Sequence, residues 1–351
     1  MNDKLDNIQF LRALAAILVV ASHLTASVMG RSAESGIEFN LGEGLSFGGF
    51  GVDIFFVISG FIMVYISEAK KSTSQINFLI KRGIRIYPIY WVCSLALLIF
   101  YALPLTKVAP PDIVSVIKSF FLFPEINTEG KMRPSLVGQG WTLIFELYFY
   151  LVFSFALKLS LEKKTLLTAG LILCVFLLAN TVGLGVFNYV LGNSLCFEFV
   201  LGMLIAVLMC KGYALIGMFK IAAYVLMLVS CTLVIFDVSW WCEQDRLIAK
   251  GVPAFFIVLV FVLDKNIQKI RFSKLSNLLG NASYSIYLTH MIGIIAFSII
   301  WKRDWLLGER FASYVGLDVY FGILLLGLCF IGVLFYWCVE KPMMKLSRFL
   351  F

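Results

Sequence analysis

Charge is scarce in this sequence. Only 14% of its 351 residues are charged, whereas 61% are hydrophobic, and an ordinary soluble domain is about 25% charged. Histidine is also rare, with 2 in the whole chain, and the 8 cysteines show no CxxC spacing. The low charge excludes a single soluble fold, and the cysteine spacing indicates neither a disulfide framework nor a metal site.

The hydrophobic residues gather in blocks of about twenty, the length of helix that crosses a hydrocarbon layer of about 30 Å. This pattern predicts an all-α fold, a polytopic membrane bundle of about ten transmembrane helices. Because ten spans use about 200 residues, no loop is long enough for a separate domain of the usual ~100 residues or more. We therefore expect a single transmembrane domain over 1–351. The expected spans are 10–29, 47–66, 86–103, 137–157, 165–184, 189–209, 218–236, 249–263, 281–301 and 319–338.

Basic residues are unevenly distributed between the expected loops. With the N-terminus in the cytoplasm, the inner segments hold 18 Lys and Arg and the outer segments hold 10. This bias predicts that both termini are cytoplasmic. The net charge of +8 then reflects cytoplasmic loops beside anionic membrane lipids, so we expect no nucleic-acid partner. The longest polar stretch, 104–135, falls outside and is rich in proline, which predicts an ordered cap or a partial re-entrant segment.

Few ionisable side chains fall inside the expected spans. A charge buried at mid-bilayer costs several kcal/mol on most scales, so each one indicates a site or a paired structural contact. Arg12 and His23 share one helix face, because eleven residues at 100° each end about 20° past three full turns, about 16 Å apart along the axis. The ionisable residues in the spans are Arg12, His23, Asp53, Glu146, Glu198 and His290.

His23 is expected in the outer half of the membrane, at a depth similar to those of Asp53 and Glu146. An imidazole can take a proton from an alcohol while a carboxylate fixes its tautomer, which is the pairing that general base catalysis uses. In the purely structural alternative, His23 only forms a hydrogen bond to a neighbouring helix.

Two further segments carry basic residues or glycines at the ends of expected spans. Arg82 and Arg85 lie on the same side of a helical turn, where forked guanidiniums can bind phosphates. The alternative for this pair is an ordinary cytoplasmic anchor. The glycine-rich segment 48–60 begins a span, and small residues there favour close helix packing over ligand binding.

Six motifs occur in order along the chain: Arg12 with ten residues before His23, the run 51–60, Arg82 to Pro88, Trp141 to Glu146, Ser283 to His290, and Glu340-Lys341-Pro342. Taken together, these motifs resemble the acyltransferase 3 family of integral membrane acyltransferases, which transfer acyl groups, usually acetyl, to sugars. The resemblance covers essentially the whole chain, and its opening segment 8–16 is most similar to stand-alone members associated with bacterial exopolysaccharide and O-antigen acetylation.

The resemblance implies a multi-pass O-acyltransferase of the bacterial inner membrane. Its donor would be a cytoplasmic acyl-CoA, such as acetyl-CoA, and its acceptor a hydroxyl of a surface glycan or of a lipid-linked saccharide. Arg12, Arg82 and Arg85 would bind the donor's phosphates. His23 would act as general base or as a transient acyl carrier, with Glu146 orienting it.

His290 is the third candidate catalytic residue, and its alternative is a packed, hydrogen-bonded core residue in a tyrosine-rich span. Acyl-CoA is a substrate here, so we expect no permanently bound cofactor and no metal. The central expectation is that the helix face joining Arg12 to His23 forms the path of the activated ester.

Two other function classes remain open at the level of sequence. Bundles with buried ionisable residues often form transport pathways, so a transporter or flippase of a glycan precursor is the alternative. Many transporters have two related halves, and no such pair is evident here. A purely structural assembly subunit would be unaffected by His23→Ala.

Overall fold

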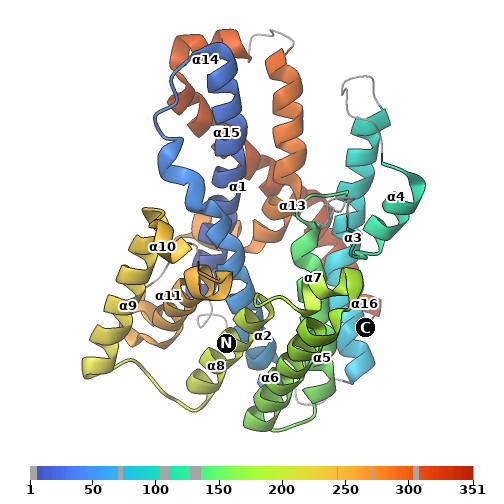
Figure 1. The fold of residues 1–351 in the computed structure, drawn as a ribbon, viewed down its shortest axis with the longest axis vertical. Coiled ribbons are helices and arrows are strands. Elements are labelled where there is room, and N and C mark those ends of the chain that lie inside the picture. Colours follow the sequence, from blue (N-terminus) through green and yellow to red (C-terminus); the bar gives the residue numbers. More distant parts are fainter. Residues whose placement is uncertain are drawn as a thin grey trace.

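The computed structural model describes residues 6–69, 74–102, 111–126, 136–242, 244–270, 272–302 and 308–350, and the regular elements within them are helices (Figure 1). The longer helices are α1 (Asp6–Ser35), α2 (Gly51–Ala69), α3 (Gln75–Ala102), α5 (Gly140–Ala156), α6 (Leu161–Leu178), α8 (Cys196–Cys210), α9 (Gly217–Ile235), α11 (Val252–Leu263), α13 (Lys274–Lys302), α15 (Leu317–Phe335) and α16 (Lys341–Leu350). The shorter ones are α4 (Ile113–Phe120), α7 (Asn188–Leu191), α10 (Ser239–Cys242), α12 (Lys265–Gln268) and α14 (Glu309–Val315). The 3-10 segments η1 (Glu43–Phe50) and η3 (Gly185–Phe187) and the π-helical turns η2 (Ala179–Gly183), η4 (Leu247–Gly251) and η5 (Tyr336–Glu340) connect them.

The helices match the predicted spans. In the described ranges, 8 helices are long and apolar enough to cross a membrane, and two predicted spans correspond to the shorter apolar helices Gly140–Ala156 and Leu247–Leu263. The predicted polytopic helical bundle is therefore confirmed. The cytoplasmic location of both termini stays a prediction.

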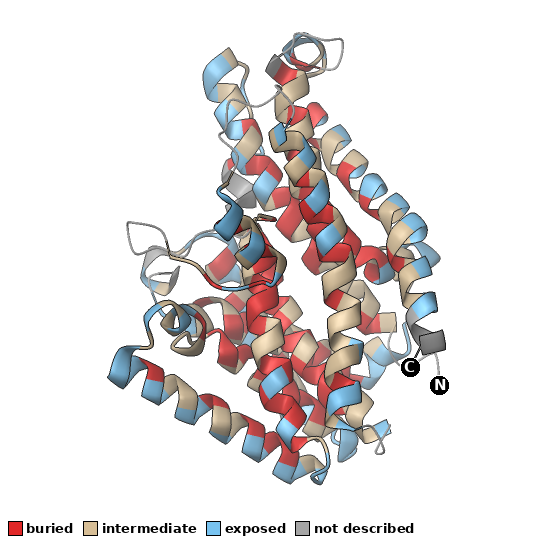
Figure 2. Ribbon diagram, turned by 90° about the vertical axis from the view of Figure 1, so that its right-hand side faces the viewer, coloured by how far each residue is buried: buried red, intermediate tan, exposed pale blue. Residues whose placement is uncertain are grey.

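The centre of the bundle is formed by α1, α2 and α13. The span that contains α2 is 67% buried, whereas those that contain α6, α9 and α15 are each 17% buried. The main helix pairs are α1 with α13, α2 with α8, and α13 with α15. Figure 2 shows buried residues along the facing sides of the long helices and exposed residues on their outer sides. The outer sides include Leu166, Met218 and Leu326, apolar side chains of the kind that lipid contact requires.

Close approach between α2 and its neighbours depends on glycine. A Cβ atom added to Gly60 would overlap the carbonyl oxygen of Phe199 on α8, and one added to Gly51 would overlap the carbonyl oxygen of Ala15 on α1. Small residues let helix backbones touch in this way. The interpretation of segment 48–60 as a packing feature is thus confirmed for these two glycines.

We expect Gly60→Ala to destabilise the protein by about 1–3 kcal/mol, because the added methyl group forces α2 and α8 apart. The effect would be measured as a lower unfolding temperature of the purified protein in detergent. Gly170→Ala is the matched control, since a Cβ atom there meets nothing within 4 Å. An unchanged unfolding temperature for Gly60→Ala would contradict this packing.

Part of the long polar stretch forms the short helix α4, which lies against α3. The carboxylate of Asp112 caps α4 by accepting a hydrogen bond from the Ser115 amide. From α3, the Tyr90 hydroxyl donates to the Ser119 carbonyl at 2.9 Å. The expected ordered segment is confirmed for residues 111–126, while 103–110 and 127–135 lie outside the described residues.

Candidate functional site

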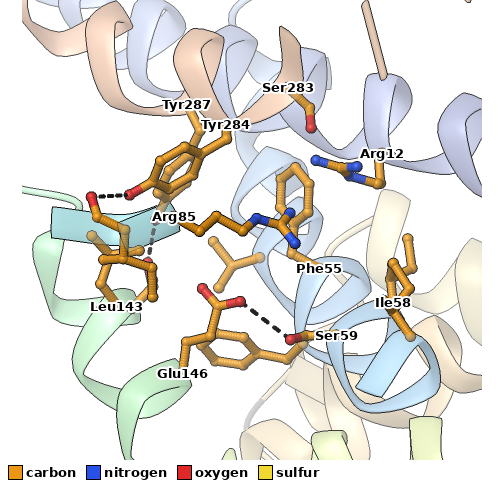
Figure 3. Close-up of a pocket in the computed structure, with 15 residues that line it drawn as sticks. Arg12, Phe55, Ile58, Ser59, Arg85, Leu143, Glu146, Ser283, Tyr284 and Tyr287 are labelled. Atoms are coloured by element: carbon orange, nitrogen blue, oxygen red, sulfur yellow. Dashed lines mark hydrogen bonds between the residues drawn. The ribbon is translucent and has the colours of Figure 1, made fainter. Parts of the chain in front are cut away.

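A first cavity of about 80 Å³ lies between α1, α2, α3, α5 and α13. Figure 3 shows Arg12 from α1 and Arg85 from α3 extending toward each other, with the carboxylate of Glu146 from α5 below them. The rest of the wall is largely apolar and includes Phe55, Phe56, Ile58, Ile62 and Leu143. The cavity is therefore a narrow, largely hydrophobic slot into which two guanidiniums extend toward each other. We call it the arginine cavity.

The charges of the two guanidiniums in the arginine cavity are offset only at longer range, by Glu146 and Glu340, which interact electrostatically with both Arg12 and Arg85. Among the described residues, neither Arg12 nor Arg85 forms an ion pair, and Arg12 donates only a long hydrogen bond of 3.4 Å to Gln9. Glu146 instead accepts hydrogen bonds from the Tyr150 hydroxyl and, at 3.2 Å, from Ser59. Free guanidinium forks favour an anionic or strongly polar ligand.

Arg82 is separated from this cavity. Its guanidinium lies over the rings of Phe78, at 5.3 Å, and Tyr150, at 5.6 Å. Three residues of helix turn the chain by about 300°, so Arg82 and Arg85 point about 60° apart. The predicted pair is thus divided: Arg85 lines the cavity and Arg82 packs beside it on aromatic rings.

A second cavity, of about 690 Å³, contains His23 in its wall. We call it the histidine cavity. His23 is exposed, and its Nδ1 lies 2.9 Å from the carbonyl oxygen of Val19 one turn earlier in α1. Because a carbonyl only accepts, Nδ1 carries the proton and the neutral ring keeps an unprotonated Nε2. His23 therefore has the tautomer that a general base needs, set by its own helix.

His290 lies directly behind His23. The centroids of the two rings are 5.1 Å apart, and His290 is 1% exposed. The side-chain amide of Gln139 donates to Nε2 of His290 at 3.0 Å. His290 lines neither cavity, so it contacts the candidate base rather than open space. Gln139 was not predicted, and the only sequence signal for it is its place two residues before Trp141.

Asp53 is held by Arg246, 193 residues away along the chain. The Nε and Nη2 atoms of Arg246 donate to the two carboxylate oxygens of Asp53 at 2.9 and 3.0 Å, and Asp53 is fully buried. The same guanidinium lies over the ring of Trp141, 5.6 Å from its centroid. Asp53 therefore pairs with an arginine from a later loop instead of with His23. The sequence indicated only that a carboxylate inside a span, such as Asp53, needs a paired contact. It did not identify Arg246 as the partner.

Glu198, another buried carboxyl of the predicted spans, lies next to this pair. It is fully buried, and its electrostatic neighbours are Asp53, Arg246 and Asp245. A Cβ atom on Gly251 would come within 3.0 Å of its Oε1 atom. It lines neither cavity.

Comparison with known proteins decides the family. The family model described as "Acyltransferase domain" matches residues 5–338. The chain belongs to the acyltransferase 3 family. It is also 31% identical over 316 residues to the "Exopolysaccharide production protein ExoZ" of Rhizobium meliloti (strain 1021), covering 88% of this chain and 93% of ExoZ. No solved structure matches. The resemblance that the sequence motifs indicated is confirmed, and the protein is a multi-pass membrane acyltransferase.

In this acyltransferase 3 protein the two cavities adjoin at a shared wall. Val52 and Tyr287 line both of them, and the Tyr287 hydroxyl lies 2.8 Å from the Thr142 hydroxyl. Between Arg12 and His23, by contrast, the face of α1 is closed, because Ala16 and Val19 are fully buried. The expected path along that face is thus displaced: the cavities meet beside α1, at Val52 and Tyr287.

Glu146 also differs from its expected position. It was expected to orient His23, yet it lines the arginine cavity and takes its hydrogen bonds from Ser59 and Tyr150. The acyltransferase 3 site thus places two arginines and one carboxylate on one side of the shared wall and the two histidines on the other.

Proposed function

We propose that the protein transfers an acyl group from cytoplasmic acyl-CoA to a hydroxyl of an exopolysaccharide or of its lipid-linked precursor, in the bacterial inner membrane. The acyl group in this proposal is acetyl. The observation that carries the proposal is the pair of adjoining cavities, one with unpaired guanidiniums and one with an exposed imidazole. The printed name of the relative ExoZ supports the choice of acceptor.

The arginine cavity suits the donor. With the N-terminus in the cytoplasm, Arg12 lies nearer that side than His23, because it is eleven residues earlier in α1. Arg12 and Arg85 would bind phosphate or carbonyl oxygens of acyl-CoA. The apolar remainder of the slot would hold the pantetheine arm and direct the thioester toward Val52 and Tyr287.

The histidine cavity suits the acceptor. His23 Nε2 would take the proton from the acceptor hydroxyl while that oxygen attacks the thioester carbonyl. The C–S bond then breaks, and the imidazolium returns the proton to the departing thiolate, so the products are an ester and CoA. His290 and Gln139 would keep the His23 ring in place from behind.

Glycan analysis of a deletion strain tests this function. We expect the strain to make and export its surface polysaccharide without the ester groups that the parent strain carries, as measured by NMR and mass spectrometry. Wild-type protein should restore the esters, and His23→Ala should not. Retention of an intracellular saccharide precursor would instead support a transporter, and unchanged esters would refute the proposal.

A further inference from the structure

Two sequence motifs converge on one side of the histidine cavity without a part in the proton transfer. One supplies Asp53 and the other supplies Trp141, and both contact Arg246. Trp141 and Arg246 line the cavity together with Asp245 and Asn193. This cluster has the composition of a binding surface: aromatic rings next to side chains that donate and accept hydrogen bonds.

Arg246 is fixed and its charge is compensated. Its two bonds to Asp53 hold the guanidinium rigidly, and Asp53 is fully buried, so that carboxylate stays with the arginine. One edge of the guanidinium is occupied, and the Nη1 edge keeps its donors. The Asp53–Arg246 ion pair as a whole has no net charge, so its rigidly held N–H donors suit a neutral hydroxyl or carbonyl better than an anion.

Asp245 adds negative charge to the same wall. One of its oxygens accepts from the Leu247 amide at 2.9 Å, which leaves the other oxygen as an acceptor. Glu198 is buried next to Asp53, and as a carboxyl group it brings no cation to this wall. The charge balance of this wall is therefore neutral to negative, because Asp53 compensates Arg246 and Asp245 adds a further carboxylate.

An aromatic surface completes the cluster. The Tyr189 ring lines the cavity and is 42% exposed, so its face is available to a ligand. At about 690 Å³, the cavity lies in the range of about 300–1,000 Å³ that pockets for small ligands occupy.

We infer that this wall is the acceptor subsite and that it selects an uncharged sugar unit over an anionic one such as a uronic acid. Tyr189 would stack on the apolar face of the sugar ring, Arg246 and Asn193 would donate to its hydroxyls, and Asp245 would accept from one. The subsite rests on the proposed function for its biological acceptor, but its preference follows from the charges of the wall. An anionic sugar would face the Asp245 carboxylate with no unpaired cation in return.

Equilibrium binding to the full-length protein in nanodiscs, without acyl-CoA, tests this subsite separately from catalysis. The probes are a neutral gluco-oligosaccharide of four residues and a counterpart of equal length that contains glucuronic acid. We expect the neutral probe to bind at least about tenfold more tightly. Tyr189→Ala should weaken its binding roughly 2- to 10-fold, whereas Tyr213→Ala, at a tyrosine that is 62% exposed outside the cavity, should not.

The contribution of the Asp245 charge to sugar selectivity is tested by Asp245→Asn, which keeps a side-chain oxygen to accept from the Leu247 amide. This variant should reduce the preference for the neutral probe, while the control Asp237→Asn, at an exposed position outside the cavity, should keep it. Equal binding of both probes to the wild type, no binding of either, or an unchanged preference in Asp245→Asn would overturn the inference. Selective binding without acyl transfer to any acceptor would uphold the subsite and refute the proposed function.

Discussion

Replacing His23 with Ala should lower the rate of acyl transfer by about 10²–10⁴-fold, the usual contribution of a general base. The reason is geometric: His23 is the imidazole in the cavity wall, and its Nδ1 bond to Val19 leaves Nε2 free to accept a proton. The measurement is release of CoA and formation of labelled ester by the purified protein with a saccharide acceptor. Acyl-CoA binding should change little, because the arginine cavity does not include His23.

Ser27→Ala is the control for this variant, since Ser27 lies one turn further along α1 and lines neither cavity. His290→Gln should have a smaller effect than His23→Ala, because His290 acts only through the His23 ring. A His23→Ala protein that keeps more than a tenth of the wild-type rate would refute the assignment of the base.

Replacing Arg85 with Ala should weaken acyl-CoA binding roughly 10- to 150-fold. A hydrogen bond to a charged group contributes about 1.5–3 kcal/mol, and each 1.4 kcal/mol changes a dissociation constant about tenfold. Arg85 has no ion pair within the described ranges to satisfy it otherwise. Titration calorimetry with CoA and acetyl-CoA would measure the loss, and Arg12→Ala should behave alike.

Arg82→Ala separates this prediction from a general effect of basic charge. Arg82 packs on Phe78 and Tyr150 outside both cavities, so its loss should lower the unfolding temperature more than the affinity for the donor. A greater loss of donor affinity in Arg82→Ala than in Arg85→Ala would show that the pair binds in a different arrangement from the one described.

The positions of the membrane helices were predictable from sequence because hydrophobic length alone determines which segments can span a bilayer. Each of the ten predicted spans corresponds to an apolar helix. The π-helical turn η5 was not predictable. It carries Glu340, which accepts a hydrogen bond from Ser285 of α13, and such a turn depends on packing between distant helices.

The candidate site was partly predictable. Helical periodicity put Arg12 and His23 on one face, and the structure places each of them on a cavity. Periodicity says nothing about which helices become neighbours, so the contact of His23 with His290 and the Asp53–Arg246 pair were beyond its reach. For the same reason Glu146 was expected beside the imidazole and lies with the arginines.

In the proposed reaction, donor and acceptor meet at the wall formed by Val52 and Tyr287, beside His23. A cryo-EM structure of the protein with a non-hydrolysable acetyl-CoA analogue would show this meeting point. We expect density for the analogue in the arginine cavity, contacts from Arg12 and Arg85, and an acyl carbonyl at the shared wall facing His23. An analogue bound elsewhere, or with its acyl group turned away from the histidine cavity, would contradict it.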